Sequence, residues 1–295
     1  MKQKFKEFVE HHRWIKWIPN SLTLCNSLCG FASILITFLS YRYIGDAERM
    51  PQVFALSAGM ILFAMVFDAF DGFAARILNA GSMHGLQMDS LADMVTFGVA
   101  PATLVAVMAN NYLGDEITMK KLSVICILCA VYLGCAALRL ATYNVHAILE
   151  KKSSEKFSGL PSPGGAAAIC VLVIFTTSAG IDQKVFFPFC LPLYAAILGL
   201  LMVSSIPYTH FAKWIISCKR DRKRLMFLIL LFVVWGISGF AARLETGSCN
   251  WYFFPALVVN SYVFWGPIGY LAVKLGLLRG RVDFGSEDGG EDSSK

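Results

Sequence analysis

The sequence predicts an all-α integral membrane protein. Of its 295 residues, 56% are hydrophobic and only 16% are charged, whereas soluble domains carry about 25% charged residues. A helix crosses a bilayer with about 20 apolar residues, and the chain contains runs that approach this length. They cover residues 22–41, 52–67, 91–110, 122–141, 163–181, 185–206, 225–242 and 252–273. This composition excludes a soluble enzyme, a disordered protein and a nucleic-acid binder.

The order of the segments divides the chain into five parts. Residues 1–19 mix aromatic and basic side chains, which predicts an interfacial amphipathic helix. Residues 20–206 contain six of the apolar runs and form the predicted core. A basic linker, 207–224, precedes two additional transmembrane helices within 225–275. The last part, 276–295, ends in Gly, Ser and acidic residues and is expected to be disordered.

The Lys and Arg residues predict how these helices are oriented. With the N-terminus inside and eight spans, 20 Lys and Arg lie on the inner side and 6 on the outer side. This asymmetry agrees with the positive-inside rule. The net charge of +6 is therefore a topology signal and implies no nucleic-acid partner. A bacterial inner membrane is the simplest location.

Four aspartates stand at helical spacing on two neighbouring spans. Asp68 and Asp71 are three residues apart, and Asp89 and Asp93 are four apart, so each pair lies on one helix face. The short segment 79–82 allows a hairpin that brings the two faces together. Each charged side chain costs about 2.5–3.5 kcal/mol inside a membrane. One or two divalent cations would offset this cost, and oxygen ligands favour Mg²⁺, Mn²⁺ or Ca²⁺.

Small residues lie between these aspartates. Gly72, Ala75 and Gly85 permit close packing of helices or close approach of a ligand. Arg76 can bind a phosphate through two parallel hydrogen bonds. The alternative interpretation is a set of interfacial acids at helix ends, with small residues that serve packing.

The complete segment from Asp68 to Asp93 reads D-x2-D-G-x2-A-R-x8-G-x3-D-x3-D. It resembles the signature of the CDP-alcohol phosphotransferases, and the resemblance covers roughly residues 15–205. It implies a six-helix membrane core with two divalent metal ions, Mg²⁺ or Mn²⁺, in a homodimer. It also implies a CDP-linked lipid at the cytoplasmic face and an alcohol that displaces CMP.

The same resemblance implies a role for each residue of the signature. Asp68, Asp71 and Asp89 would be metal ligands, and Asp93 would be the general base and a further metal contact. The CDP pocket would be lined by Gly72, Ala75, Arg76 and Gly85.

Four stretches, one of which overlaps the end of the signature, resemble the branch of this family that joins CDP-diacylglycerol to L-serine. These stretches are residues 18–26, 89–101, 139–144 and 157–163. Serine needs a cation for its carboxylate and acceptors for its ammonium group, and we expect Arg139 and Asn144 to supply them. Arg139 can instead be a snorkelling cation at a helix end, and Asn144 a turn residue. Thr23 and Asn26 share a helix face and are expected to bind cytosine or phosphate.

Two other functions are compatible with part of this pattern. A sister enzyme that uses glycerol 3-phosphate or inositol phosphate would need more cations for the acceptor phosphate than Arg76 and Arg139 provide. An ion-coupled transporter would also place acidic residues in the membrane. Transporters, however, usually show internal repeats and helices broken near mid-membrane, whereas these acids gather in one hairpin.

Overall fold

The computed structural model describes residues 17–78, 83–114, 118–149, 159–178, 186–206, 208 and 253–274. Every regular element in these ranges is a helix, and no strand occurs among them, which confirms the all-α class. Several predicted features lie outside the described residues. They are most of the amphipathic segment 1–19, the turn 79–82, almost all of the linker 207–224, the span 225–242 and the acidic tail.

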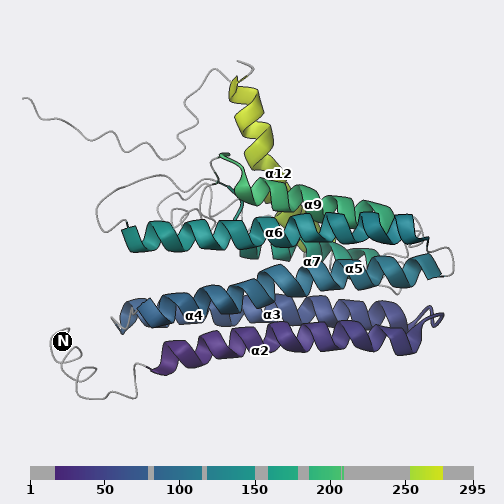
Figure 1. Ribbon diagram of the computed structural model, residues 1–295, viewed down its shortest axis with the longest axis horizontal. Coiled ribbons are helices and arrows are strands. Elements are labelled where there is room, and N and C mark those ends of the chain that lie inside the picture. Colours follow the sequence, from purple (N-terminus) through teal and green to yellow (C-terminus); the bar gives the residue numbers. More distant parts are fainter. Residues whose placement is uncertain are drawn as a thin grey trace, which may run out of the picture.

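The described residues form six helical rods that lie side by side (Figure 1). They are α2 (Trp17–Leu39), α3 (Arg49–Ile77), α4 (Met83–Asp93) continued by η3 (Met94–Val99) and α5 (Ala100–Leu113), α6 (Met119–Leu149), α7 (Ser162–Ser178), and η5 (Phe186–Cys190) continued by α9 (Leu191–Val203). A short 3-10 turn, η2 (Ser40–Tyr43), follows α2. A seventh rod, α12 (Phe253–Lys274), packs on α7 and runs steeply to the bundle in this view.

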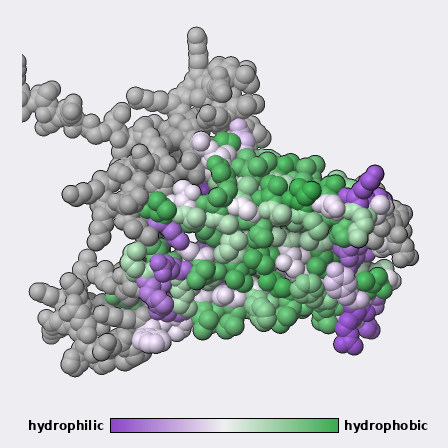
Figure 2. Space-filling model, in the orientation of Figure 1, coloured by the Kyte–Doolittle hydropathy of each residue, from purple (hydrophilic) through white to green (hydrophobic). Residues whose placement is uncertain are grey.

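The bundle has the dimensions and surface of a membrane protein. Five of its helical stretches are long and apolar enough to cross a bilayer. These are Pro19–Tyr43, Arg49–Ala75, Met83–Leu113, Met119–Val145 and Phe186–Val203. Figure 2 shows hydrophobic side chains over the middle of the visible face and hydrophilic ones gathered at its two ends. The chain is therefore an integral membrane protein.

Two helices start earlier than the apolar runs suggested. The third rod begins at Met83, whereas its apolar run begins at residue 91. The polar residues before position 91 interrupt the apolar pattern but not the helical backbone. The helix α2 begins at Trp17, within the segment predicted to lie at the interface. Pro19 does not interrupt it, since proline is tolerated in the first turn of a helix.

A buried cluster of hydroxyl groups joins α2 to α3. Ser33, Thr37 and Ser57 are fully buried. The Oγ of Ser57 lies 2.8 Å from the Oγ of Ser33 and 2.6 Å from the Oγ1 of Thr37. Hydroxyls of this kind hold transmembrane helices together by hydrogen bonds between them. The pairing of α2 with α3 holds the N-terminal part of α2 beside the C-terminal end of α3, where the predicted site residues lie.

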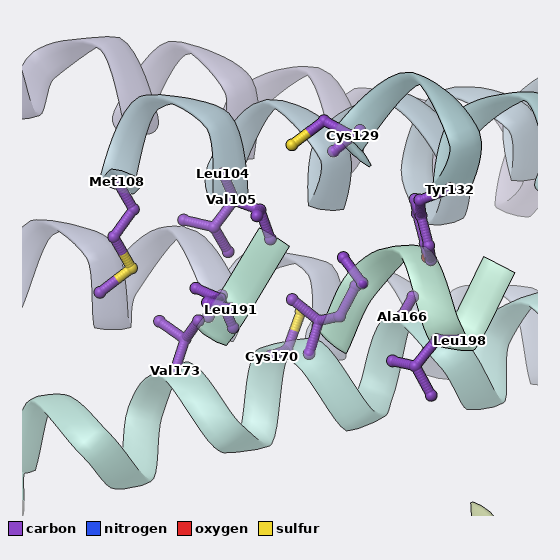
Figure 3. Close-up of a cluster of buried hydrophobic side chains, with 14 of the residues drawn as sticks. Leu104, Val105, Met108, Cys129, Tyr132, Ala166, Cys170, Val173, Leu191 and Leu198 are labelled. Atoms are coloured by element: carbon purple, nitrogen blue, oxygen red, sulfur yellow. The ribbon is translucent and has the colours of Figure 1, made fainter. Parts of the chain in front are cut away.

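The hydrophobic core lies between α3, α5, α6, α7 and α9. Tyr132 and Leu198 enter it from α6 and α9 (Figure 3). At Gly199, a Cβ atom would stand 2.7 Å from the Cα of Tyr132, so the absent side chain lets α9 lie directly on α6. This close contact fixes the position of Tyr132.

Candidate active site

Three of the predicted aspartates meet at one end of the bundle. Asp68 and Asp71 come from the last turns of α3, and Asp89 comes from α4. One carboxylate oxygen from each of these three residues lies within 4.8 Å of the other two. Asp71 is only 5% exposed, and the other two are partly buried. The hairpin of α3 and α4 thus brings together carboxylates that are up to 21 residues apart.

Asp93 lies at the C-terminal end of α4, beside Asp68 and Asp89. Its Oδ1 accepts a hydrogen bond of 3.2 Å from the Nδ2 of Asn26. Asp93 is not one of the three residues whose oxygens converge. A carboxylate next to a metal-binding group, oriented by an amide, has the placement expected of a proton acceptor.

The helix α2 supports the carboxylates from behind. The Oγ1 of Thr23 lies 2.9 Å from the Oδ2 of Asp71, to which it donates. Asn26, one turn further on, donates to Asp93 and is fully buried. Thr23 and Asn26 share a helix face, as their spacing predicts. In this structure that face is directed at the aspartates.

The donor set fits a divalent cation. The Oδ1 of Asp89 is buried and has no hydrogen-bond partner, and an ionised carboxylate can only accept. Three such groups within 4.8 Å of one another repel each other strongly, because the interior screens charge poorly. A hard cation with oxygen ligands would relieve this repulsion and satisfy the free oxygen of Asp89.

The small residues of the signature lie on the same hairpin. Gly72 and Ala75 follow Asp71 on α3, and Gly85 lies in the first turn of α4. All three are partly buried. Arg76 belongs to the last turn of α3, but its side chain lies outside the described residues. The backbone positions of these residues therefore lie next to the carboxylates, at the same end of the bundle.

Arg139 and Asn144 lie on α6 and contact different neighbours. The Nη1 of Arg139 donates to the carbonyl oxygen of Met202, at 3.2 Å, where a cation also stabilises the C-terminal end of α9. The Oδ1 of Asn144 accepts a hydrogen bond of 2.7 Å from the Oγ of Ser90. Asn144 therefore contacts the helix that carries Asp89 and Asp93, and Arg139 contacts α9.

Gly159 brings a loop against Arg139. Its φ of +90° is in the region that favours glycine. A Cβ atom at this position would stand 2.3 Å from the carbonyl oxygen of Met202 and 3.0 Å from Nη1 of Arg139. The loop is further held by the backbone N–H of Gly159, which donates to the carbonyl of Ile206 at 2.8 Å. These contacts fix the guanidinium between α6, α9 and the loop.

Some residues near the site were not singled out from the sequence. Thr96 donates to the backbone carbonyl of Asn26 at 3.1 Å, and Tyr132 donates to the carbonyl of Phe97 at 2.7 Å. The spacing of Thr96, three residues after Asp93, was a usable signal, because both lie on one helix face. Nothing in the sequence marks Tyr132, which is 35 residues from its partner.

Fold and site together define a helical membrane protein with a carboxylate centre at one end of its bundle, suited to a divalent cation. The chain belongs to the CDP-alcohol phosphatidyltransferase family, whose profile matches residues 16–204. The match covers the six-rod bundle, from α2 to the end of α9, and leaves α12 outside. This agrees with the resemblance found in the signature.

Several curated proteins are similar to the chain over most of this region. A protein of Bacillus subtilis is 36% identical over 200 residues, which cover 68% of this chain and 93% of the relative. A protein of Helicobacter pylori is 30% identical over 218 residues, 72% of this chain and 84% of the relative. A protein of Methanocaldococcus jannaschii is 31% identical over 199 residues, which cover 68% of this chain and 77% of the relative. All three are named CDP-diacylglycerol–serine O-phosphatidyltransferase.

Proposed function

We propose that the chain is a CDP-diacylglycerol–serine O-phosphatidyltransferase, which makes phosphatidylserine. In the reaction, the serine hydroxyl oxygen bonds to the phosphorus that carries diacylglycerol, and the bond from that phosphorus to CMP breaks. The observation that carries this proposal is the convergence of the signature aspartates on the hairpin of α3 and α4. The names of the relatives supply the donor lipid and the acceptor alcohol.

Asp93 is the general base in this proposal. An alcohol is a weak nucleophile at neutral pH, so its proton must be accepted as the oxygen attacks. The carboxylate of Asp93 takes this proton, while the Nδ2 of Asn26, 3.2 Å from its Oδ1, holds the carboxylate in one orientation. Asp93 also lies beside Asp68 and Asp89, so the proton acceptor stands next to the groups that would hold the metal ions.

Asp68, Asp71 and Asp89 would hold two divalent ions, Mg²⁺ or Mn²⁺, with Asp93 as a further ligand. When bound, such ions stabilise the charge that develops on the phosphoryl oxygens and on the leaving CMP. Thr23 contributes by donating to the Oδ2 of Asp71, which restricts the rotation of that carboxylate.

The donor lipid would bind along the same hairpin. Gly72, Ala75 and Gly85 leave room for the nucleotide, and Arg76 would contact a phosphate. Thr23 and Asn26 support this pocket from α2, where their polar groups are already directed at Asp71 and Asp93.

In its cellular setting, the site would face the cytoplasm of a bacterial inner membrane, with the N-terminus inside. The excess of Lys and Arg in the predicted inner segments supports this orientation. The resemblance to the family supports a homodimer.

An acceptor panel tests the proposed function. The purified full chain, with CDP-diacylglycerol and Mn²⁺ or Mg²⁺, is expected to release CMP with L-serine. Glycerol 3-phosphate and inositol phosphate are expected to give no release above the level without acceptor. The lipid product is identified by mass spectrometry. Release of CMP with one of the phosphorylated alcohols alone would assign the activity of a sister enzyme. If no acceptor gave CMP release, the chain would not be a transferase, and ion transport would be measured next.

Arg139 is the proposed partner of the serine carboxylate, and Asn144 of its ammonium group. Replacing Arg139→Lys keeps the charge but removes the planar fork of N–H donors. We expect the KM for serine to rise about tenfold, because a hydrogen bond to a charged group is worth about 1.5–3 kcal/mol. The KM for CDP-diacylglycerol should stay within about twofold.

The matched control for this prediction is Arg49→Lys. Arg49 is exposed and pairs with Asp46, near the other end of the bundle, so the same chemical change should leave both KM values unaltered. An unchanged KM for serine in Arg139→Lys, with or without a lower melting temperature, would assign Arg139 to holding α9 alone.

A further inference from the structure

The helix that carries Asp89 and Asp93 changes its winding directly after Asp93. Residues Met94–Val99 form a π-helix, η3, between α4 and α5, and the backbone N–H of Ala100 donates to the carbonyl of Val95, five residues earlier. Such π-helical turns are rare and are frequent at functional sites. A second one among the described residues, η5, begins the rod of α9, but of the two only η3 follows directly on a residue of the aspartate centre. A wide turn leaves backbone groups without their usual partners, so something must hold this one in place.

From one side, α2 holds the π-helix. The Oγ1 of Thr96 donates to the backbone carbonyl of Asn26 at 3.1 Å. In an α-helix this carbonyl already accepts from the N–H of residue 30, and a carbonyl oxygen has a second lone pair for Thr96. Residue 30 is a glycine, and a Cβ atom there would stand 2.5 Å from the Oγ1 of Thr96. The absent side chain of Gly30 is therefore what admits the threonine.

From the opposite side, α6 holds the same turn. Tyr132 is fully buried in the core (Figure 3), and its hydroxyl donates to the carbonyl of Phe97 at 2.7 Å. The backbone of Tyr132 is held in turn by α9, because Gly199 lies directly against it. Two buried hydroxyls, from Thr96 and Tyr132, thus fix the turn that follows Asp93.

These contacts reach the carboxylate of Asp93 through Asn26. Thr96 fixes the backbone of Asn26, and the Nδ2 of the same residue donates to Asp93. The Oδ1 of Asn26 is buried without a partner, so no second hydrogen bond of its amide holds the side chain. The hydrogen bond by which Asn26 orients the carboxylate of Asp93 therefore depends on where the backbone of Asn26 lies.

We propose that Thr96 and Tyr132 are positioning residues of the transfer reaction, which hold the π-helical turn and, through Asn26, direct the carboxylate of Asp93 at the serine hydroxyl. The inference rests on the proposed function and adds to it two residues that touch no reacting atom. A displaced proton acceptor slows the chemical step and leaves substrate binding intact, since a small misplacement can lower a rate by orders of magnitude.

Two variants that remove only a hydroxyl test the inference. In Thr96→Val and Tyr132→Phe, we expect kcat with serine to fall by about 10-fold to 100-fold, the usual effect of losing a supporting hydrogen bond around a metal site. The KM values for CDP-diacylglycerol and serine should stay within about twofold. Thr96→Ser, which restores the donor, should recover most of kcat. Steady-state kinetics of the purified full chain and its melting temperature are measured together.

Thr176→Val is the matched control. Thr176 is also a buried threonine, 1% exposed, but its hydroxyl donates within its own helix α7. Its kcat should equal that of the unaltered chain within about twofold. If Thr96→Val does not fold, Tyr132→Phe alone decides the matter, because it removes a single oxygen atom.

The inference is overturned if either variant keeps kcat within twofold, or if kcat falls no more than in Thr176→Val. A lower melting temperature with an unchanged kcat would assign the hydroxyls to stability only. Failure of the proposed function looks different, because the unaltered chain would then release no CMP with serine.

Discussion

Replacing Asp93→Asn is expected to lower kcat for phosphatidyl transfer by about 100-fold to 10,000-fold, the range that a general base contributes. The amide keeps an oxygen that can accept from the Nδ2 of Asn26, 3.2 Å from Oδ1 in the unaltered protein, but it cannot take a proton. Because the three converging carboxylates are untouched, the KM for CDP-diacylglycerol should change by no more than about threefold. Initial rates of CMP release give both values.

The control for this variant is Asp46→Asn. Asp46 lies near the other end of the bundle, where its Oδ1 accepts from the backbone N–H groups of Glu48 and Arg49 at the start of α3. Asparagine caps a helix as well as aspartate does, so activity and stability should both persist. If Asp93→Asn kept its full kcat and bound metal and donor lipid normally, Asp93 would not be the general base.

Replacing Asp89→Asn is expected to abolish the response to divalent metal. Its unpartnered, buried Oδ1 and the convergence with Asp68 and Asp71 make it a ligand in the proposal. For the unaltered chain, Mn²⁺ at about 100 times its Kd should add about 2.7 kcal/mol of stability. The variant should gain almost none and lose more than about 100-fold in kcat. Thermal unfolding with and without Mn²⁺ measures the first effect.

Without metal, the same variant should be more stable than the unaltered chain. The substitution removes one of three negative charges that repel each other in a poorly screened site. A residue needed only for packing would instead lower the stability without metal when it is replaced. The sign of the change in stability therefore distinguishes a metal ligand from such a residue. Glu48→Gln, which neutralises an exposed acid near the other end of the bundle, should leave thermal unfolding unchanged both with and without Mn²⁺. A metal response that survives in Asp89→Asn would show that other groups bind the ion.

The aspartate centre was predictable because its geometry is local. Two pairs at helical spacing, in a hairpin with a short connection, leave little freedom in where the carboxylates lie. Four charged groups in a membrane protein are also costly in free energy, which indicates a functional site. The same reasoning placed Thr23 and Asn26 on one face of α2. It did not show that Thr23 donates to Asp71 or that Asn26 donates to Asp93, since these contacts span 48 and 67 residues.

Contacts that depend on how distant helices pack were not accessible in the same way. A π-helix has no reliable pattern in a sequence, and the closeness of α2 at Gly30 follows from the register between two helices. Arg139 illustrates the same limit. Its position at a helix end was expected, but its hydrogen bond to Met202 and the loop at Gly159 depend on where α9 ends.

The hydroxyl cluster of Ser33, Thr37 and Ser57 has a consequence for biogenesis. Its hydrogen bonds join only α2 and α3, so they can form once these two segments have entered the bilayer, before the rest of the chain has been synthesised. Thr23 and Asp71 lie on the same two helices and would meet at that stage. Half of the carboxylate centre is then in place when the next segment arrives, and Asp89 and Asp93 insert against a surface already arranged to receive them.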